Sequence, residues 1–177
     1  MYFNTILESF FALEQIQQTS IREVILEHRS LSRMGKQSTK SLITLLEEVL
    51  SRKLSPVLQW DILSTEHTFR KSLKTLNRLP LSKFHAIRVQ DLGAAEWIRR
   101  EHPKLPLHLI VESANHNLAG LQRWIDYFGR QLQRLVLSTE LPKSVLIKYS
   151  KILTVPCEIL AVGRIILFYS PRKLLRS

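Results

Sequence analysis

The sequence predicts an α/β fold in which parallel strands alternate with helices, a (β/α) TIM-barrel-like arrangement that is short or incomplete. Two observations predict this fold: short runs of branched aliphatic residues alternate with segments of helical periodicity, and the connections between them are short. A third observation, the length of 177 residues, limits the barrel, because a complete eight-unit barrel needs about 250 residues. We therefore expect one (β/α) barrel-like domain over residues 1–177, with six firm parallel strands and up to two weaker ones.

The firm strands are predicted from runs whose length and composition are typical of buried strands, since two covered faces remove the need for polar alternation. These runs are residues 21–27, 56–63, 84–90, 107–112, 132–137 and 157–162. Two further runs, MYFNTI at residues 1–6 and RIILFY at residues 164–169, predict the weaker strands. Short connections between parallel strands imply right-handed crossovers. A doubly wound open sheet is the alternative, but the Gly-rich first turn that usually accompanies it is absent.

Helices are predicted between the strands by apolar residues that recur at helical spacing. Three stripes show this spacing: Leu42, Leu45, Leu46, Val49 and Leu50; Leu118, Leu121, Ile125 and Phe128; and Val145, Tyr149 and Ile152. We expect Asn117 to cap the second of these helices and Gly129 to end it in a left-handed turn. We expect Ser138 or Thr139 to cap the third, with Pro142 in its first turn.

The charge balance is strongly basic, with 26 Lys and Arg residues against 15 Asp and Glu residues and a net charge of +11. Such a balance favours association with nucleic acid, anionic surfaces or acidic partners. Lys71, Lys74 and Arg78 recur at helical spacing. This pattern predicts either RNA binding through a basic outer face or an ordinary solvated helix face.

Cys157 is the only cysteine, which rules out an internal disulfide and any cysteine-built zinc or iron–sulfur site within one chain. We expect this residue to act as a small buried apolar side chain. The longest apolar runs are too short to span a bilayer, and the N-terminus has an early acid and no signal-peptide features. These observations predict no membrane span and a cytoplasmic location.

Acidic residues recur where the predicted strands end. The ends of five successive predicted strands carry a third of the 15 acids in the chain, namely Glu27, Asp61, Asp91, Glu112 and Glu140. The carboxyl ends of parallel strands form the functional face of an α/β sheet, so these five are candidate catalytic residues. Carboxylates packed together raise one another's pKa values, which produces general acids and bases. Such a rim would also suit a divalent cation, an amine or a basic peptide.

Structural roles are the alternative for these acids. Asp91 precedes the helical segment LGAAEW, where an acid favours a helix start. In this alternative, others pair with Arg29, Arg88 or Arg164 and are structural. No Ser-His-Asp order, HExxH motif or P-loop is present, and we assign no metal ligands.

Two histidines lie near the predicted rim. His116, within ESANHN, is a candidate for proton transfer at the rim, or an ordinary loop histidine. His108 lies inside the predicted strand LHLIV and is expected in the core or the barrel interior.

Four segments together resemble peptidase family U32, the collagenase-like proteases. They are VQDLGA at residues 89–94, PLHLIVESANHN at 106–117, RLVLSTELP at 134–142 and CEILAVGRIILFYS at 157–170. In that family a strand ending in Gln-Asp-Leu-Gly precedes a strand with an inward histidine, and a later strand closes in Leu-Ser-x-Glu-Leu. The order and spacing agree with the family from about residue 7 to residue 170.

The resemblance implies a (β/α) barrel and a protease or other hydrolase with its acid-rich site at the strand ends. It also implies a peptide or small-molecule substrate, oriented by Gln90, Asn115, His116 and Asn117, with Arg164 and Arg172 binding an anionic group. Other family members act in oxygen-independent hydroxylation of transfer RNA, ribosomal RNA or ubiquinone precursors, several with a cysteine-bound iron–sulfur cluster.

This chain departs from the family pattern at two places. It has no cysteine after Gly163, where the family's cysteines fall, and Thr139 stands where the family often has a basic residue. We therefore expect no iron–sulfur cluster. The alternative function is a cluster-free accessory or RNA-binding module related to the hydroxylation proteins, which works as a homo-oligomer or with a larger family member.

Overall fold

A single parallel sheet organises the computed structural model, which describes residues 3–16, 19–111 and 117–163. Its seven strands follow one another in chain order, and every neighbouring pair is parallel. The strands are β1 (Asn4–Ile6), β2 (Glu23–Glu27), β3 (Ser55–Trp60), β4 (Ala86–Val89), β5 (Leu107–Ile110), β6 (Leu132–Val136) and β7 (Cys157–Glu158). The unbroken order confirms the barrel-like prediction and excludes the doubly wound alternative, in which the strand order reverses.

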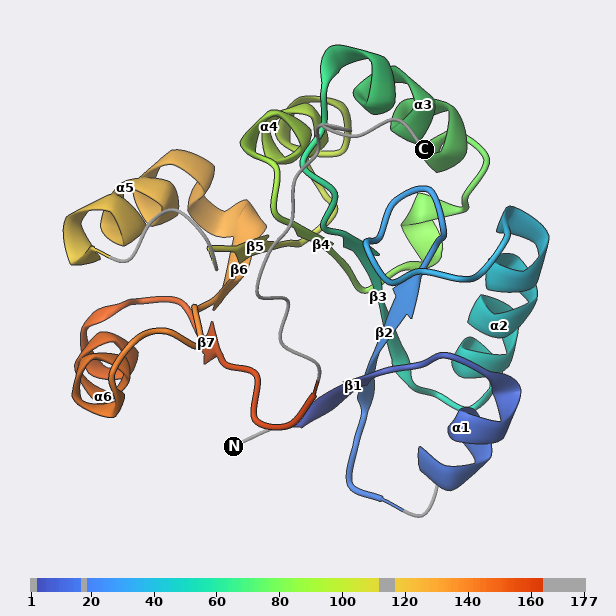
Figure 1. The fold of residues 1–177 in the computed structure, drawn as a ribbon, viewed down its shortest axis with the longest axis horizontal. Coiled ribbons are helices and arrows are strands. Elements are labelled where there is room, and N and C mark those ends of the chain that lie inside the picture. The colour runs from blue at the N-terminus through green and yellow to red at the C-terminus, as the bar shows by residue number, and fades with distance from the viewer. Residues whose placement is uncertain (1–2, 17–18, 112–116, 164–177) are drawn as a thin grey trace, which may run out of the picture.

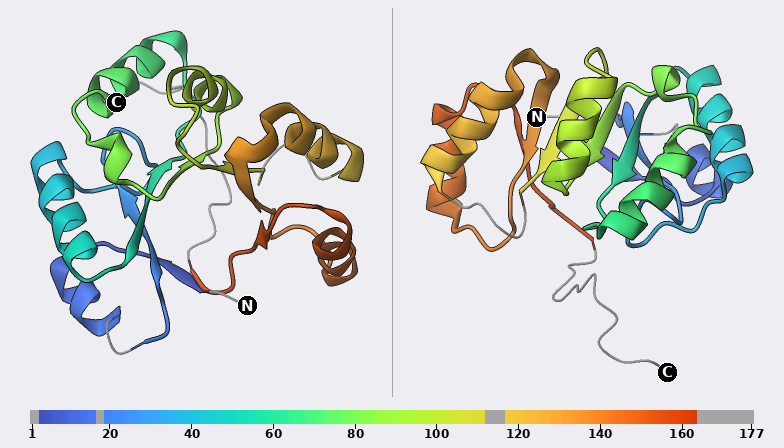
Figure 2. Two further views of the ribbon diagram at one scale, coloured as in Figure 1. Left: turned by 180° about the vertical axis from the view of Figure 1, so that it is seen from behind. Right: turned by 90° about the horizontal axis from the view of Figure 1, so that it is seen from above.

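Helices follow the strands and lie outside the curled sheet (Figures 1 and 2). They are α1 (Phe10–Ile16), α2 (Thr39–Ser51), α3 (Glu66–Leu76), α4 (Leu92–Glu101), α5 (Leu118–Phe128) and α6 (Lys143–Ile152), with short 3-10 helices η1 (Leu81–Lys83) and η2 (Gly129–Gln131). In the part of the chain that the structure describes, no helix has the length and apolar character needed to cross a bilayer.

Each predicted firm strand has a counterpart in the sheet, and the weaker run at residues 1–6 supplies β1. The other weaker run, residues 164–169, lies outside the described residues. Asn117 caps α5 by accepting a hydrogen bond from Gly120 N at 2.7 Å, as predicted. Gly129 ends this helix with the expected positive φ of 54°, but its ψ of −134° lies outside the left-handed helical region.

The predicted cap of α6 is wrong. Pro142 occupies the N-cap position with extended dihedral angles, and it makes no side-chain cap. The Ser138 hydroxyl instead accepts a hydrogen bond from Glu140 N at 3.1 Å, inside the turn that follows β6. Because this local turn uses the serine oxygen, α6 begins only at Lys143.

The two faces of the sheet differ in character. Val24, Leu26 and Leu58 belong to the large apolar core that also includes helix residues. Trp60 is fully buried in the same core and stacks on Phe69 of α3, with 5.7 Å between ring centroids. The opposite, concave face carries only a small apolar cluster, and most of its other side chains are polar or charged.

Polar side chains on the concave face join the two edges of the sheet. Arg134 of β6 pairs with Glu23 of β2, through Nη2 and Oε2 at 3.0 Å, and with Glu158 of β7 at 3.0 Å. Asn4 of β1 donates to the same Glu158 at 2.7 Å, and Arg88 of β4 also pairs with Glu158. Among the described residues β1 and β7 form no backbone ladder. Charge-assisted side-chain bonds therefore connect strands at the two ends of the sheet order.

His108 lies on the same concave face and is 2% exposed, which confirms the prediction of a buried strand histidine. Burial, helped by the positive charge of Arg134, lowers the pKa of His108 to about 4. The imidazole is therefore neutral at physiological pH and adds no third positive charge beside the two arginines.

Candidate active site

Two of the predicted acids meet at the carboxyl ends of neighbouring strands. Glu27 ends β2 and Asp61 follows β3, and both are buried, at 6% and 2% exposure. The amide nitrogen of Gln59 lies 3.3 Å from Glu27 Oε1 and 3.1 Å from Asp61 Oδ2. One side-chain amide therefore links both carboxyl groups.

The loop at residues 28–37 fixes Asp61. The backbone N–H of Arg33 donates to Asp61 Oδ1 at 2.8 Å, and Arg33 Nε donates to Oδ2 at 3.0 Å. The loop itself is tied to β3, because Ser32 Oγ donates to Gln59 O at 2.8 Å. Asp61 thus has a fixed position and a cationic partner on one side.

Gly35 lets this loop turn tightly. A Cβ atom at this position would lie 2.5 Å from the carbonyl oxygen of His28, closer than real Cβ contacts come. The same carbonyl accepts hydrogen bonds from Leu31 N and Ser32 N, both at 2.9 Å. The glycine therefore allows the close backbone approach that holds Arg33 against Asp61.

The pKa of Glu27 is raised to about 7. Burial is the largest cause, and the negative charges of Asp61 and Glu8 add to it, while Arg88 and Arg33 oppose it. A carboxyl group with such a pKa is divided between its two protonation states near neutral pH, which is the condition for general acid–base chemistry. Arg33 pairs with Asp61, and among the described ion pairs none involves the Glu27 carboxyl group.

A small hollow opens above Glu27 at the surface. Its lining consists of Leu7, Glu8, Glu27, Met34, Lys36 and Gln37. Lys36 Nζ lies 3.6 Å from Glu8 Oε2 at the exposed border, where both side chains are mostly in solvent. The hollow is small, at about 10 Å³, which is about the space of a single water molecule, and one cation and one anion lie at its edge.

His28, next to Glu27, has a structural role. Its Nδ1 accepts a hydrogen bond from Ser30 N at 3.0 Å, so the ring proton lies on Nε2, which is 3.1 Å from Thr39 Oγ1. Burial, with a contribution from the charge of Arg29, lowers the pKa of His28. This neutral imidazole holds the start of the loop to the first turn of α2.

Asp91 and Asn117 serve as helix caps. Asp91 Oδ1 accepts a hydrogen bond from Ala94 N at 2.9 Å, at the start of α4, and its Oδ2 accepts one from Ser64 N at 3.0 Å. Both carboxylate oxygens of Asp91 are thus bound to backbone N–H groups. Gln90 is buried at the end of β4, beside Asp91.

Glu140 lies in the exposed turn between β6 and α6, and β6 and β2 lie on different sides of the curled sheet (Figure 1). The other predicted site residues, Glu112, Asn115, His116, Arg164 and Arg172, lie outside the described residues. Of the five predicted acids, the described part of the chain therefore brings together Glu27 and Asp61 alone.

Three residues of this site were missed from the sequence: Gln59, Arg33 and Glu8. Gln59 carried a usable signal, because it lies two positions before Asp61 on the same strand and therefore points to the same face of the sheet. Arg33 and Glu8 reach the site from loops, and no sequence spacing indicates their contacts.

An iron–sulfur cluster does not fit this chain. Cys157 is the only cysteine, whereas such clusters need several thiolates. The Cys157 thiol packs against the apolar core, and burial raises its pKa, which disfavours the thiolate. Among the described residues, no group of three or more His, Cys, Asp or Glu side chains is arranged to hold a metal ion.

The chain matches one protein family in sequence and is similar in fold to two solved structures. A sequence profile described as peptidase family U32 matches residues 21–177. The solved structure of the U32 peptidase Mk0906 is 13% identical and superimposes with a TM-score of 0.65, over 90% of this chain and 68% of that one.

A second solved structure is a monomeric form of the dimeric phosphoribosylanthranilate isomerase from Thermotoga maritima. It is 12% identical, with a TM-score of 0.55 over 90% of this chain and 86% of that one. At these identities the two structures establish similarity of fold alone. A search of curated protein sequences finds no match.

Proposed function

Because this chain belongs to peptidase family U32, we propose that it is a hydrolase acting on peptide bonds, with Glu27 as its general acid–base residue. The observation that carries the proposal is the buried carboxyl group of Glu27, whose pKa of about 7 lies near physiological pH. Acids and bases with pKa values near the working pH are the most effective proton-transfer catalysts.

The proposed reaction is the addition of water to a carbonyl carbon. Ionised Glu27 takes a proton from the attacking water, the water oxygen bonds to the carbonyl carbon, and the protonated carboxyl then returns the proton to the leaving nitrogen as the C–N bond breaks. Asp61, held by Arg33, stays in place and maintains the raised pKa of Glu27 through its negative charge. Gln59 positions both carboxyl groups.

The pH dependence of peptide hydrolysis tests this proposal. The purified protein is incubated with a mixture of fluorescence-quenched peptides over a range of pH values. We expect kcat/KM to rise with pH and to reach half of its maximum near pH 7, because the free enzyme must hold Glu27 ionised. Absence of cleavage at every pH, or a profile without a transition near this value, would reject Glu27 as the base.

A cluster-free accessory or RNA-binding module is the second candidate. Lys71, Lys74 and Arg78 are exposed on and beside α3, and no ion pair of these three occurs in the described part of the chain. Such unpaired cations on an outer helix suit phosphate binding.

A fluorescence anisotropy titration of labelled single-stranded RNA at several salt concentrations tests this second candidate. We expect affinity to fall with salt, and replacement of Lys71, Lys74 and Arg78 by glutamine to reduce the log–log salt slope by about 2, since each single-strand phosphate contact contributes about 0.7. RNA affinity that is unaffected by salt, or a slope that the triple variant leaves unchanged, speaks against binding through α3.

A further inference from the structure

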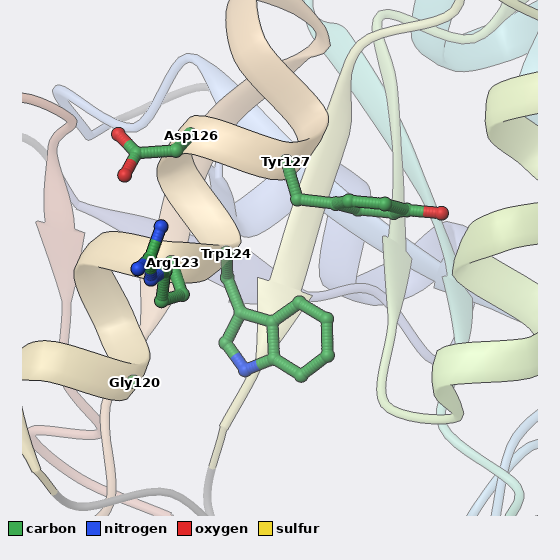
Figure 3. A pocket seen from close by; sticks show the side chains of 5 residues that line it. All are labelled: Gly120, Arg123, Trp124, Asp126 and Tyr127. Carbon is green, nitrogen blue, oxygen red and sulfur yellow. The ribbon is translucent and has the colours of Figure 1, made fainter.

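The outer surface of α5 has a hollow of about 440 Å³. Gly120, Arg123, Trp124, Asp126 and Tyr127 line it, all from one helix (Figure 3). Because all five residues belong to one helix, the hollow is a shallow, open depression, and its lining is mainly apolar and aromatic, as ligand sites are. Helix α5, which carries all five residues, lies outside the curled sheet, away from its concave face (Figure 1).

Two aromatic rings at nearly a right angle form the apolar part of this hollow. The centroids of Trp124 and Tyr127 are 6.3 Å apart, and their planes meet at 83°. Phe128 packs behind both rings, at 6.1 Å from Trp124 and 5.1 Å from Tyr127. The two rings therefore present a corner whose walls are an aromatic face and an aromatic edge.

The Tyr127 wall is held in place from α4. Its hydroxyl donates to Glu96 Oε2 at 2.8 Å, and the guanidinium of Arg99 lies 5.1 Å from the ring centroid. Tyr127 nevertheless remains 52% exposed. A large apolar ring that is both exposed and fixed at two points is a preorganised contact surface, because little side-chain entropy remains to be lost on binding.

We propose that this hollow is a docking site for an extended proline-rich peptide segment with acidic residues beside the prolines. Polyproline II segments bind to aromatic-lined grooves because they are already extended and lose little entropy on docking. The corner between Trp124 and Tyr127 suits a proline ring, which packs its C–H groups on an aromatic face and needs no hydrogen bond.

Charge favours acidic flanks in that segment. Arg123 and Asp126 line the hollow, and Tyr127 connects it to Glu96 with its two arginine partners, Arg99 and Arg100. Three guanidinium groups thus face two carboxylates at this border, in a chain of net charge +11. Acidic residues beside the prolines would be attracted to this surplus, whereas basic residues would be repelled.

The ring geometry favours a peptide over single-stranded nucleic acid. Successive bases stack on aromatic faces, whereas the ring of Trp124 stands at 83° to the ring of Tyr127. A perpendicular pair of rings can hold one ligand group in its corner, but it does not offer parallel faces on which several bases could stack. Binding at this hollow is also independent of the chemistry at Glu27, so hydrolysis and docking can fail separately.

Fluorescence anisotropy with a fluorescein-labelled polyproline peptide flanked by glutamates tests the inference on the full chain. We expect saturable binding, and Trp124→Ala or Tyr127→Ala should weaken it by at least about tenfold, as expected for buried aromatic anchors of an interface. Tyr127→Phe keeps the ring and removes the bond to Glu96, so it should weaken binding by less than Tyr127→Ala.

Phe11→Ala is the matched control, because Phe11 is an aromatic residue that is 69% exposed on a different helix, α1. This variant should bind the peptide as the wild type does. Circular dichroism melts confirm that each variant is folded. The inference is overturned if a folded Trp124→Ala variant binds as well as wild type, if a lysine-flanked peptide binds more tightly, or if labelled single-stranded RNA competes for the hollow in a Trp124-dependent way.

Discussion

Replacement of Glu27 by glutamine is expected to abolish peptide hydrolysis and, at the same time, to stabilise the folded protein at alkaline pH. Activity should fall because glutamine cannot accept or return a proton, a loss of about 10²–10⁴-fold for a general acid–base residue. Stability should rise because the glutamine variant removes a carboxylate that is costly to ionise in the fold. An activity loss with a stability gain separates a catalytic residue from a structural one.

The direction of the pH effect follows from the raised pKa. Glu27 ionises near 4.5 as a free side chain and near 7 in the fold. Its contribution to stability is therefore fully present below pH 4.5 and is lost as pH rises through about 7. Relative to the wild type, Glu27→Gln should unfold with a free energy larger by about 1–3 kcal/mol near pH 8, and with little difference near pH 4.

Urea denaturation followed by circular dichroism at both pH values measures this difference. Glu47→Gln is a suitable control, because Glu47 is an exposed carboxylate on α2, and its replacement should change stability by less than about 0.5 kcal/mol at either pH. A Glu27→Gln variant that is less stable than the wild type at alkaline pH would mean that the native carboxylate is stabilised. The raised pKa and the proposed acid–base role would then both be wrong.

Such a residue is typical of functional sites, where evolution retains groups that lower stability because activity needs them. The residues around Glu27 maintain the free-energy cost of ionising its carboxyl group. Gln59 and Arg33 hold Asp61 nearby, so the negative charge that raises the pKa of Glu27 cannot move away. The site therefore keeps the pKa of the Glu27 carboxyl group close to neutral pH.

The sheet could be predicted from the sequence because each strand is a local feature. Runs such as residues 56–63 and 107–112 are apolar enough to be strands without knowledge of their partners, and their spacing requires crossover helices. The position of the acids at the strand ends could likewise be predicted from the neighbouring residues alone. Glu27 and Asp61 lie close together because β2 and β3 are neighbours in the parallel sheet.

The separate fates of the other acids were not predictable in the same way. Asp91 lies two residues beyond the end of β4, whereas Asp61 lies one residue beyond the end of β3, and the Asp91 carboxylate turns to the backbone of α4. A one-residue change in strand length moves a side chain to the other face, and sequence reasoning locates strand ends only to within a few residues. Orientation at a strand end is therefore decided by tertiary packing.

The charged network on the concave face also escaped prediction. Alternation along β2 places Glu23, Ile25 and Glu27 on one side, and this period was available in the sequence. What the sequence lacks is the pairing of Glu23 with Arg134, which lies 111 residues away. Their meeting depends on the curl of the whole sheet, which no local pattern encodes.

This network leads to the second large expected effect. Replacement of Arg134 by methionine should lower the free energy of unfolding by about 2–4 kcal/mol, since loss of one partner leaves carboxylates poorly solvated and unpaired. Arg134 connects Glu23 to Glu158, and with them the second and the last strands of the sheet. Methionine retains the apolar bulk of the side chain. The loss in free energy of unfolding therefore measures the contribution of the Arg134 charge and its hydrogen bonds.

Arg99→Met is the matched control. Arg99 also bonds a carboxylate, that of Glu96, but it is 38% exposed and lies on a helix surface. Removal of an exposed, solvent-screened pair of this kind should lower stability far less than Arg134→Met does. Glu23→Gln in the Arg134→Met background should recover part of the stability, because it removes the stranded charge.

The pH dependence of the Arg134→Met effect distinguishes charge from packing. Burial alone would raise the pKa of Glu23, but in the native protein the hydrogen bond and the charge of Arg134 outweigh it and hold that pKa below 4.5. Native Glu23 therefore contributes stability above pH 4.5 that is lost as pH falls through its lowered pKa. In the variant the two contributions of Arg134 are lost, and the smaller ones of His108 and Asn4 remain against burial. We therefore expect the pKa of Glu23 to rise, and stability to fall as pH rises through it. The gap between wild type and variant should thus be widest near pH 8 and narrow toward pH 4, and a gap of constant size would assign the role of Arg134 to packing alone.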